Sequence, residues 1–285
     1  MRPSFQRASF AVTSVVLGVL FLTACGNSSA ASTSTTPANT PIPTNGITID
    51  ATTKLFTPFV TVVEANTTVT ITNSDTVAHN LTSVPVADPT AASFVNPDAA
   101  INQTVQGGAK TTLTFTKVGL YDLYDATQAT IDPTYHRVAP HKGTAGFPFA
   151  AEAVIWVKGT SAGLPTTTKN SVLVGKDAFE LDFVAVHTGG TGVWHNYDTD
   201  LHYVSLAPSF AGLNPAKVGD NINKVLGTDD APPTGGNTTL TFATPGLYYY
   251  FCSSHADFDT TLNRAKAHTD ASIYPIPMEG FVLVG

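Results

Sequence analysis

The chain has 285 residues, of which 42% are hydrophobic and 12% are charged, and its formal net charge is −7. An acidic surface repels phosphate groups, so nucleic acid is not an expected partner. The low charge, the abundant threonine and valine, and the regular punctuation by Gly, Pro and Asn predict an all-β fold.

The chain begins with a segment typical of export. Arg2 and Arg7 precede an apolar run over residues 8–22, the pattern of a secretory signal over residues 1–24. Its end, LTACG, resembles the lipobox of bacterial lipoproteins. The resemblance implies cleavage before Cys25, acylation of the Cys25 thiol, and a lipid-anchored position in the bacterial cell envelope, outside the cytoplasm. Cleavage leaves 12 basic and 21 acidic residues, a net charge of −9, so acyl chains rather than charge would provide membrane attachment.

Residues 25–46 (CGNSSAASTSTTPANTPIPTNG) lack apolar periodicity. This Ser/Thr/Pro-rich composition cannot bury a core and is typical of a tether. Folded structure is expected from Ile47 onward.

The remaining chain contains an internal duplication. The segment 111–121 (TTLTFTKVGLY) returns as 238–248 (TTLTFATPGLY), 127 positions later, and 73–79 (NSDTVAH) matches 196–202 (NYDTDLH), 123 positions later. Repeats of this size predict two tandem β-sandwiches. Their expected bounds are 47–159 and 170–285, with a Gly/Ser/Thr/Pro-rich connection over 159–168.

Cys252 is the only cysteine left after acylation of Cys25. Exported chains usually pair or lose their cysteines, because a free accessible thiolate is oxidised. A bound metal would explain its retention, since soft thiolate suits copper and the Cys-x-x-His spacing to His255 can bring sulfur and imidazole to one ion. The alternative is an inert buried cysteine.

Four features of the second repeat occur together: VWHN at 193–196, His202, GLYYYFCSSH at 246–255, and MEGFVLV at 278–284. They resemble the landmarks of the cupredoxins, the plastocyanin/azurin type of blue copper protein. The resemblance extends over essentially the whole mature chain. It implies two tandem Greek-key β-sandwiches and one type 1 copper in the second repeat.

The implied copper ligands are His202, Cys252, His255 and Met278. Two imidazoles and a thiolate with a long axial thioether form a blue-copper electron-transfer site. Asn196 and Asp198 are candidates for the layer around the ligands, where they would hold the loop carrying His202 or tune the ligands. Their other interpretation, as turn residues that close a β-loop, is equally open because the first repeat keeps both.

The first repeat has lost most of this set. Asp125, Gln128 and Ala151 stand where the second repeat has Cys252, His255 and Met278, and only a histidine, His79, remains. The first repeat is therefore predicted to bind no copper. A harder ion held by His79, Asp125 and His141 is the alternative.

The other histidines are weaker candidates. His268 could compete as a ligand, but its counterpart His141 persists in the repeat without the other ligands, which favours a structural role. His187 and His195 are expected to face solvent or accept hydrogen bonds. In the block 248–251, strand alternation places Tyr248 and Tyr250 on one face and Tyr249 and Phe251 on the other; core packing and an electron path are both open.

Twenty-two residues, 256–277, separate His255 from Met278, whereas small cupredoxins have a short segment there. An insertion occurs in both repeats before the last strand. Asp259 resembles a helix N-cap, so the insertion is expected to be a loop or a short helix beside the metal site. Its length makes Met278 the least secure ligand.

The leading function is a non-enzymatic, membrane-anchored carrier of single electrons between redox proteins. A copper oxidoreductase, laccase-like or nitrite reductase-like, is the alternative. The chain has no His-x-His pair, which laccases use for additional coppers, while a three-histidine copper involving His187, His195 and His268 stays open. Copper storage or delivery would predict more Met and His ligands than the chain supplies.

Overall fold

The computed structural model describes residues 45–87, 91–159, 169–197, 200–208, 223–226 and 236–285. The predicted signal, Cys25 and nearly all of the predicted tether lie outside these residues, as does most of the predicted connection 159–168. Among the described residues, no helix is long and apolar enough to cross a membrane.

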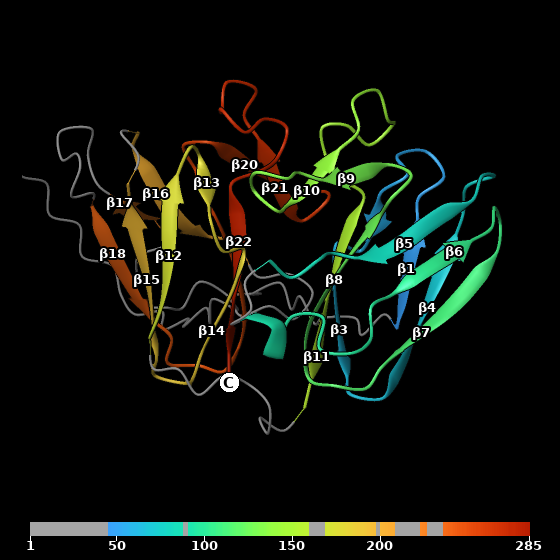
Figure 1. Cartoon of the computed structure of the whole chain (residues 1–285), viewed down its shortest axis with the longest axis horizontal. Helices are drawn as coiled ribbons and strands as arrows, with labels where there is room; N and C mark the ends of the chain where they lie inside the picture. The colour runs from blue at the N-terminus through green and yellow to red at the C-terminus, as the bar shows by residue number, and fades with distance from the viewer. Residues whose placement is uncertain (1–44, 88–90, 160–168, 198–199, 209–222, 227–235) are drawn as a thin grey trace, which may run out of the picture. The chain divides into compact units, whose positions relative to one another are not determined.

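Within the described residues, the first repeat contains strands β1 to β11 and one short 3₁₀ helix, η1 (Figure 1). One sheet has the order β2-β1-β4-β7, the facing sheet has the order β3-β11-β8-β5-β6, and β9 and β10 form a separate hairpin. The elements are β1 (Gly46–Ile49), β2 (Phe56–Thr57), β3 (Val60–Glu64), β4 (Thr67–Asn73), β5 (His79–Ser83), η1 (Ala91–Ser93), β6 (Asn102–Val105), β7 (Lys110–Phe115), β8 (Gly119–Asp125), β9 (Ala129–Ile131), β10 (Val138–Pro140) and β11 (Glu152–Lys158).

The second repeat has the same arrangement. Its sheets have the orders β13-β12-β15-β18 and β14-β22-β19-β16-β17, and β20 and β21 form the hairpin. The strands are β12 (Lys169–Gly175), β13 (Ala178–Phe179), β14 (Phe183–Val186), β15 (Thr191–Asn196), β16 (His202–Leu206), β17 (Asn223–Leu226), β18 (Asn237–Thr241), β19 (Gly246–Phe251), β20 (Ala256–Asp259), β21 (Arg264–Ala267) and β22 (Glu279–Val284).

Matching registers confirm the predicted duplication and the all-β fold of two tandem sandwiches. Glu152 pairs with Tyr124 between β11 and β8, and Glu279 pairs with Phe251 between β22 and β19. Each member of the second pair lies 127 positions after its counterpart. The duplication therefore extends from sequence blocks to individual strand partners.

Strand β19 is buried on both faces. Tyr248 and Tyr250 lie in the core of the second sandwich, while Tyr249 and Phe251 lie in a cluster that also contains Phe59 of the first repeat. The predicted alternation is confirmed. Residues 248–251 of this strand are all aromatic, and the first repeat covers the face of Tyr249 and Phe251 that solvent would otherwise reach.

An arginine of each repeat contacts the other repeat, and the two arginines occupy equivalent positions. Arg264 donates to Ala150 O at 2.7 Å and its Nη2 lies 3.3 Å from Glu152 Oε2, whereas Arg137 donates to Glu279 O. Arg137 and Glu152 precede Arg264 and Glu279 by 127 positions. Equivalent surfaces therefore meet, as the subunits of an isologous dimer do.

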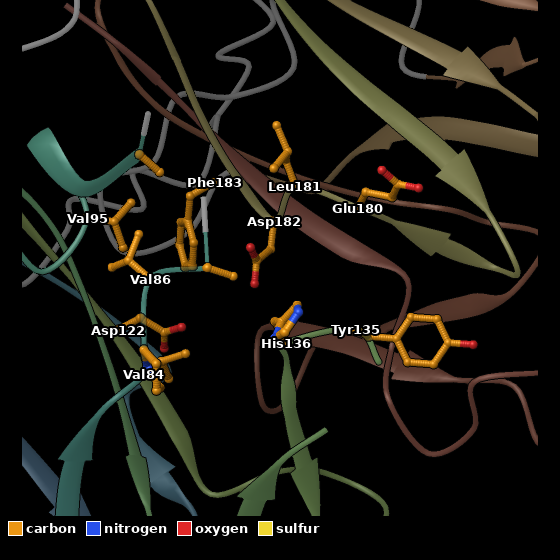
Figure 2. A pocket seen from close by; sticks show the side chains of 13 residues that line it. Val84, Val86, Val95, Asp122, Tyr135, His136, Glu180, Leu181, Asp182 and Phe183 are labelled. Carbon is orange, nitrogen blue, oxygen red and sulfur yellow. The ribbon is translucent and has the colours of Figure 1, made fainter. Parts of the chain in front are cut away.

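Buried carboxyl groups surround these arginines. Burial, with a further contribution from the charge of Glu152, raises the pKa of Asp122 well above its usual value, and burial raises the pKa of Glu279 likewise. Figure 2 shows Asp122 and Asp182 lining a pocket among apolar side chains such as Val84 and Phe183. The stability of the contact between the repeats should therefore depend on the protonation of these carboxyl groups.

The insertion before the last strand, expected to be a loop or a short helix, forms a hairpin of β20 with β21, and residues 256–277, all of them described, contain no helix. Asp259 Oδ1 accepts the N–H groups of Thr261 and Leu262, both at 2.9 Å, and Asn263 has a φ of 53°. The same side-chain acceptor that caps a helix also closes a turn. The N–H of Ala265 donates to Tyr249 Oη at 2.7 Å, so a tertiary contact supports the hairpin.

Candidate metal centre

Two of the predicted ligands lie at the same end of two paired strands. His202 is the first residue of β16, and Cys252 directly follows the last residue of β19, which pairs with β16 in antiparallel register. Alternation along β19 turns Cys252 into the core of the second sandwich. The N–H of His255 donates to Cys252 O at 3.1 Å, and this turn brings the second imidazole back toward the sulfur.

The donor atoms of these three residues converge. Cys252 Sγ lies 3.8 Å from His202 Nδ1 and 3.4 Å from His255 Nδ1. The cysteine and His202 have no exposed surface, and the side chain of His255 is 15% exposed. One imidazole is thus fully enclosed while the other reaches the surface.

These separations fit a single bound ion. Metal–sulfur and metal–nitrogen bonds of about 2.3 and 2.05 Å, at angles between tetrahedral and trigonal, separate sulfur from nitrogen by about 3.5–3.8 Å. Both observed distances lie at or close to that range. The donor set of one thiolate and two imidazoles is also the set that copper favours.

The surroundings of Cys252 act on the pKa of its thiol in two opposite directions. Burial raises the pKa of the Cys252 thiol, and backbone N–H groups, that of Tyr203 first among them, act in the opposite direction. The Tyr203 N–H donates to Cys252 Sγ at 3.3 Å. This hydrogen bond stabilises the thiolate form of Cys252, which is the form that binds a metal ion.

Met278 lies directly before β22, next to Cys252 in the sheet. The Cys252 N–H donates to Met278 O at 2.9 Å, and both side chains belong to the same buried cluster with no exposed surface. The long insertion therefore returns the chain to a position beside Cys252 in the buried core of the second repeat.

Asn196 and Asp198 were expected to lie around the ligands, and the described residues include Asn196. Asn196, the last residue of β15, is buried and its Nδ2 donates at 2.9 Å to the carbonyl of Asp200, in the loop that leads to His202. Asp198 lies outside the described residues.

Asp177 is a site residue that the sequence did not indicate. Its Oδ1 lies 3.2 Å from His255 Nε2, on the side of the ring opposite Cys252, and the residue is 5% exposed. It precedes His255 by 78 positions. Asp177 lies two residues before Phe179, as Lys54 lies two residues before the equivalent Phe56. This correspondence could have indicated Asp177, but it can be recognised only once the strand registers are known.

The remaining histidines do not join the three converging donors. His268 Nδ1 lies 2.9 Å from Ser254 O and its Nε2 lies 3.2 Å from Asp257, while His195 contacts Asn237 and His187 contacts the carbonyl of Thr188. Among the described residues, the two candidate groups of metal-binding side chains are His202–Cys252–His255 and Asp177–Asp200–His255.

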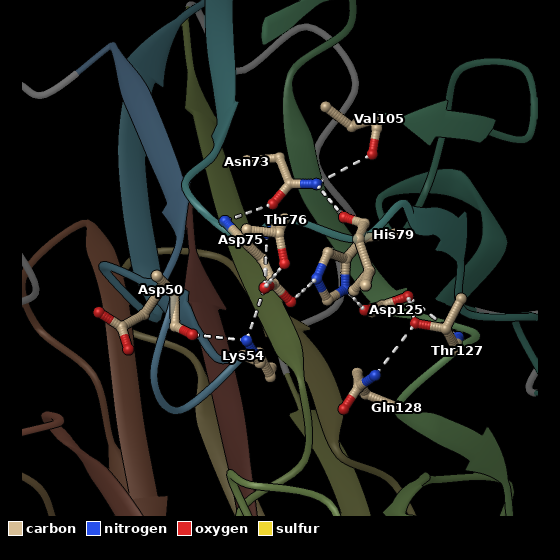
Figure 3. Close-up of polar contacts among 12 residues, drawn as sticks. Asp50, Lys54, Asn73, Asp75, Thr76, His79, Val105, Asp125, Thr127 and Gln128 are labelled. Carbon is tan, nitrogen blue, oxygen red and sulfur yellow. Dashed lines mark hydrogen bonds and ion pairs between the residues drawn. The ribbon is translucent and has the colours of Figure 1, made fainter. Parts of the chain in front are cut away.

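An ion-pair network occupies the equivalent position of the first repeat (Figure 3). His79 Nδ1 faces Asp125, which replaces the cysteine, and His79 Nε2 lies 3.0 Å from Asp75. Lys54 Nζ lies 2.7 Å from Asp75 and, by its hydrogen bond, holds the pKa of that carboxyl well below its usual range.

No known protein family and no curated protein matches the chain. Solved structures that resemble part of it are cupredoxins. An oxidised mutant of amicyanin is 19% identical over 40% of this chain and 80% of that chain, with a TM-score of 0.27. A reduced Cu(I) form of another amicyanin mutant is 21% identical over 42% and 86%, with a TM-score of 0.27. A purple cupredoxin from Nitrosopumilus maritimus is 20% identical over 40% and 98%, with a TM-score of 0.25. Scores this low carry no weight for function.

Proposed function

We propose that the chain is a type 1 copper protein that carries single electrons between redox proteins outside the cytoplasm, anchored to a membrane through Cys25. The observation that carries the proposal is the convergence of Cys252 Sγ with the Nδ1 atoms of His202 and His255 at the end of a buried sheet. Copper would supply a one-electron couple at this site.

The chain's own residues fit the carrier role. His202 and Cys252 are held by adjacent strands and enclosed by the core, so the donors keep their positions when the charge of the ion changes. His255 is the donor that reaches the surface and is proposed as the point of electron exchange with a partner. The copper site is assigned to the second repeat, residues 170–285.

The first repeat, residues 47–159, is proposed to be a copper-free supporting domain. Both ring nitrogens of its His79 already face carboxylates, Nδ1 that of Asp125 and Nε2 that of Asp75. Within the described part of the chain, no three histidines place ligand atoms within 4.8 Å of one another.

The test is to load a soluble chain of residues 47–285 with Cu(II) and to measure its visible and EPR spectra together with copper content. One copper per chain, an intense sulfur-to-copper absorption band and a narrow copper hyperfine splitting are the expected results. A colourless protein would overturn the proposal. Two coppers per chain with a second, ordinary Cu(II) signal would instead support an enzyme or a copper-handling role.

Replacing Met278 with leucine tests the axial ligand. The blue absorption is expected to remain, because the thiolate and imidazoles are untouched. The reduction potential is expected to become more positive by about 59 mV, a tenfold change in a one-electron equilibrium, because leucine offers no donor to Cu(II). Voltammetry on the two copper-loaded proteins measures this shift, and an unchanged potential would remove Met278 from the ligand set.

A further inference from the structure

Asp177 occupies a strained turn between β12 and β13. Gly175 pairs with Ala178, so Lys176 and Asp177 form a two-residue hairpin loop, with φ values of 53° and 57°. Turns of this type favour Asn-Gly because both central residues need positive φ. Non-glycine residues rarely adopt this conformation, and such strain persists only where surrounding contacts hold it.

The contacts of Asp177 provide that restraint. One carboxylate oxygen, Oδ1, lies 3.2 Å from His255 Nε2, and the other, Oδ2, accepts the N–H of Ser272 at 2.6 Å. Ser272 Oγ in turn donates to Lys176 O at 3.1 Å. The buried carboxylate thus joins the hairpin turn, the surface-reaching imidazole and the insertion that follows it.

The sign of the charge at this turn differs between the repeats. In the first repeat the equivalent residue is Lys54, which also has a positive φ, of 63°, and pairs with Asp75 beside His79. That site contains two carboxylates, and a lysine balances them. In the second repeat the turn instead supplies a carboxylate, that of Asp177, to a site with a thiol and two imidazoles.

We propose that Asp177 is a positioning residue that fixes the ring of His255 and whose negative charge favours Cu(II) over Cu(I). The inference rests on the proposed function. With Nδ1 directed at the metal beside Cys252, the neutral ring carries its hydrogen on Nε2, and that nitrogen faces Asp177. Carboxylates in this position orient metal-bound imidazoles and increase their basicity.

The charge of Asp177 acts from a nearly buried place. Its carboxylate is 5% exposed, so solvent screens it less than it screens a surface charge. Asp200 offers a carboxylate oxygen within 4.8 Å of the ligand atoms of Asp177 and His255, but it is exposed. Removing the charge of Asp177 should therefore change the reduction potential more than removing the charge of Asp200.

The experiment compares reduction potentials of copper-loaded wild type, Asp177→Asn, Asp177→Glu and Asp200→Asn at one pH. Asp177→Asn is expected to shift the potential positively by about 59 mV, a change on the order of tenfold in the Cu(II)/Cu(I) equilibrium. Asp177→Glu, which keeps the charge, should restore most of the wild-type potential, and Asp200→Asn should shift it less.

Asp257→Asn is the matched control. Asp257 Oδ1 lies 3.2 Å from His268 Nε2, the same carboxylate–imidazole separation, but the side chain of Asp257 is 81% exposed and its histidine is outside the donor group. The potential of this variant should equal that of wild type. Equal potentials for Asp177→Asn and Asp257→Asn would overturn the inference.

A second measurement does not depend on the folding of a variant. In isotope-labelled wild type loaded with Cu(I), the Nε2 hydrogen of His255 should give an NMR signal protected from exchange with water, and rapid exchange would contradict the contact with Asp177. Failure of the proposed function would appear differently, as wild type without the blue absorption. A blue wild type with an unshifted Asp177→Asn potential would reject only the role of Asp177.

Discussion

Replacing Cys252 with serine is expected to abolish the blue absorption of the copper-loaded chain and to weaken copper binding by about 100-fold or more, beyond the usual cost of altering residues around a metal ligand. The serine hydroxyl keeps its proton and is a hard donor, so it replaces neither the charge nor the softness of the thiolate. The two imidazoles, His202 and His255, would remain. Visible spectra and copper titration measure both effects.

His268→Gln is the matched control for this experiment. His268 lies in the same segment as His255, yet it contacts Ser254 and Asp257 instead of the converging donors. The variant should keep the absorption band and one copper per chain. If it lost copper while Cys252→Ser retained it, His268 would be the ligand and the site would have been assigned to the wrong side chains.

Replacing Arg264 with methionine is expected to lower the free energy of unfolding by about 3–5 kcal/mol, the usual cost of removing one partner from a buried ion pair. The Arg264 side chain is 3% exposed, contacts Glu152 and Ala150 O, and lies over the ring of Phe59 at 4.2 Å. Methionine would fill part of the space but leave Glu152 without its cation. Urea unfolding of wild type and variant measures the loss.

Lys158→Met provides the control, because Lys158 forms an exposed pair with Glu64, at 3.4 Å with side chains 44% and 68% exposed. Its cost should be below about 1 kcal/mol. Equal losses for the two variants would show that the contact between the repeats adds nothing beyond a surface pair.

The loss from Arg264→Met should depend on pH. Burial raises the pKa values of Asp122, Glu152 and Glu279 in the folded chain. Carboxyls with raised folded pKa values stabilise the fold below their unfolded pKa, and this contribution is lost as pH rises through the folded values. The charge of Arg264 lowers the pKa of Glu152, so without Arg264 that pKa rises further and the variant should lose more stability at about pH 8 than at about pH 4.5. A loss independent of pH would contradict this.

The local pattern of the sequence was sufficient for much of the fold. Repeated blocks predicted two equivalent sandwiches because a duplicated strand pattern buries the same positions twice. The alternation of Tyr248–Phe251 predicted the two faces of β19 because side chains of a strand alternate regardless of what covers them. The hairpin at 256–267 was missed because Asp259 makes the same backbone contacts in a turn as in a helix cap.

The sequence by itself determined which side chains could bind a metal in the second repeat, and it showed that the first repeat had replaced them, because these are questions of residue type and order. Only the tertiary structure decided that Asp177 faces His255, that Lys54, Asp75, His79 and Asp125 form one network, and that Arg137 and Arg264 cross between the repeats. Those contacts join segments remote in the chain, and strand register rather than local pattern brings their charges together.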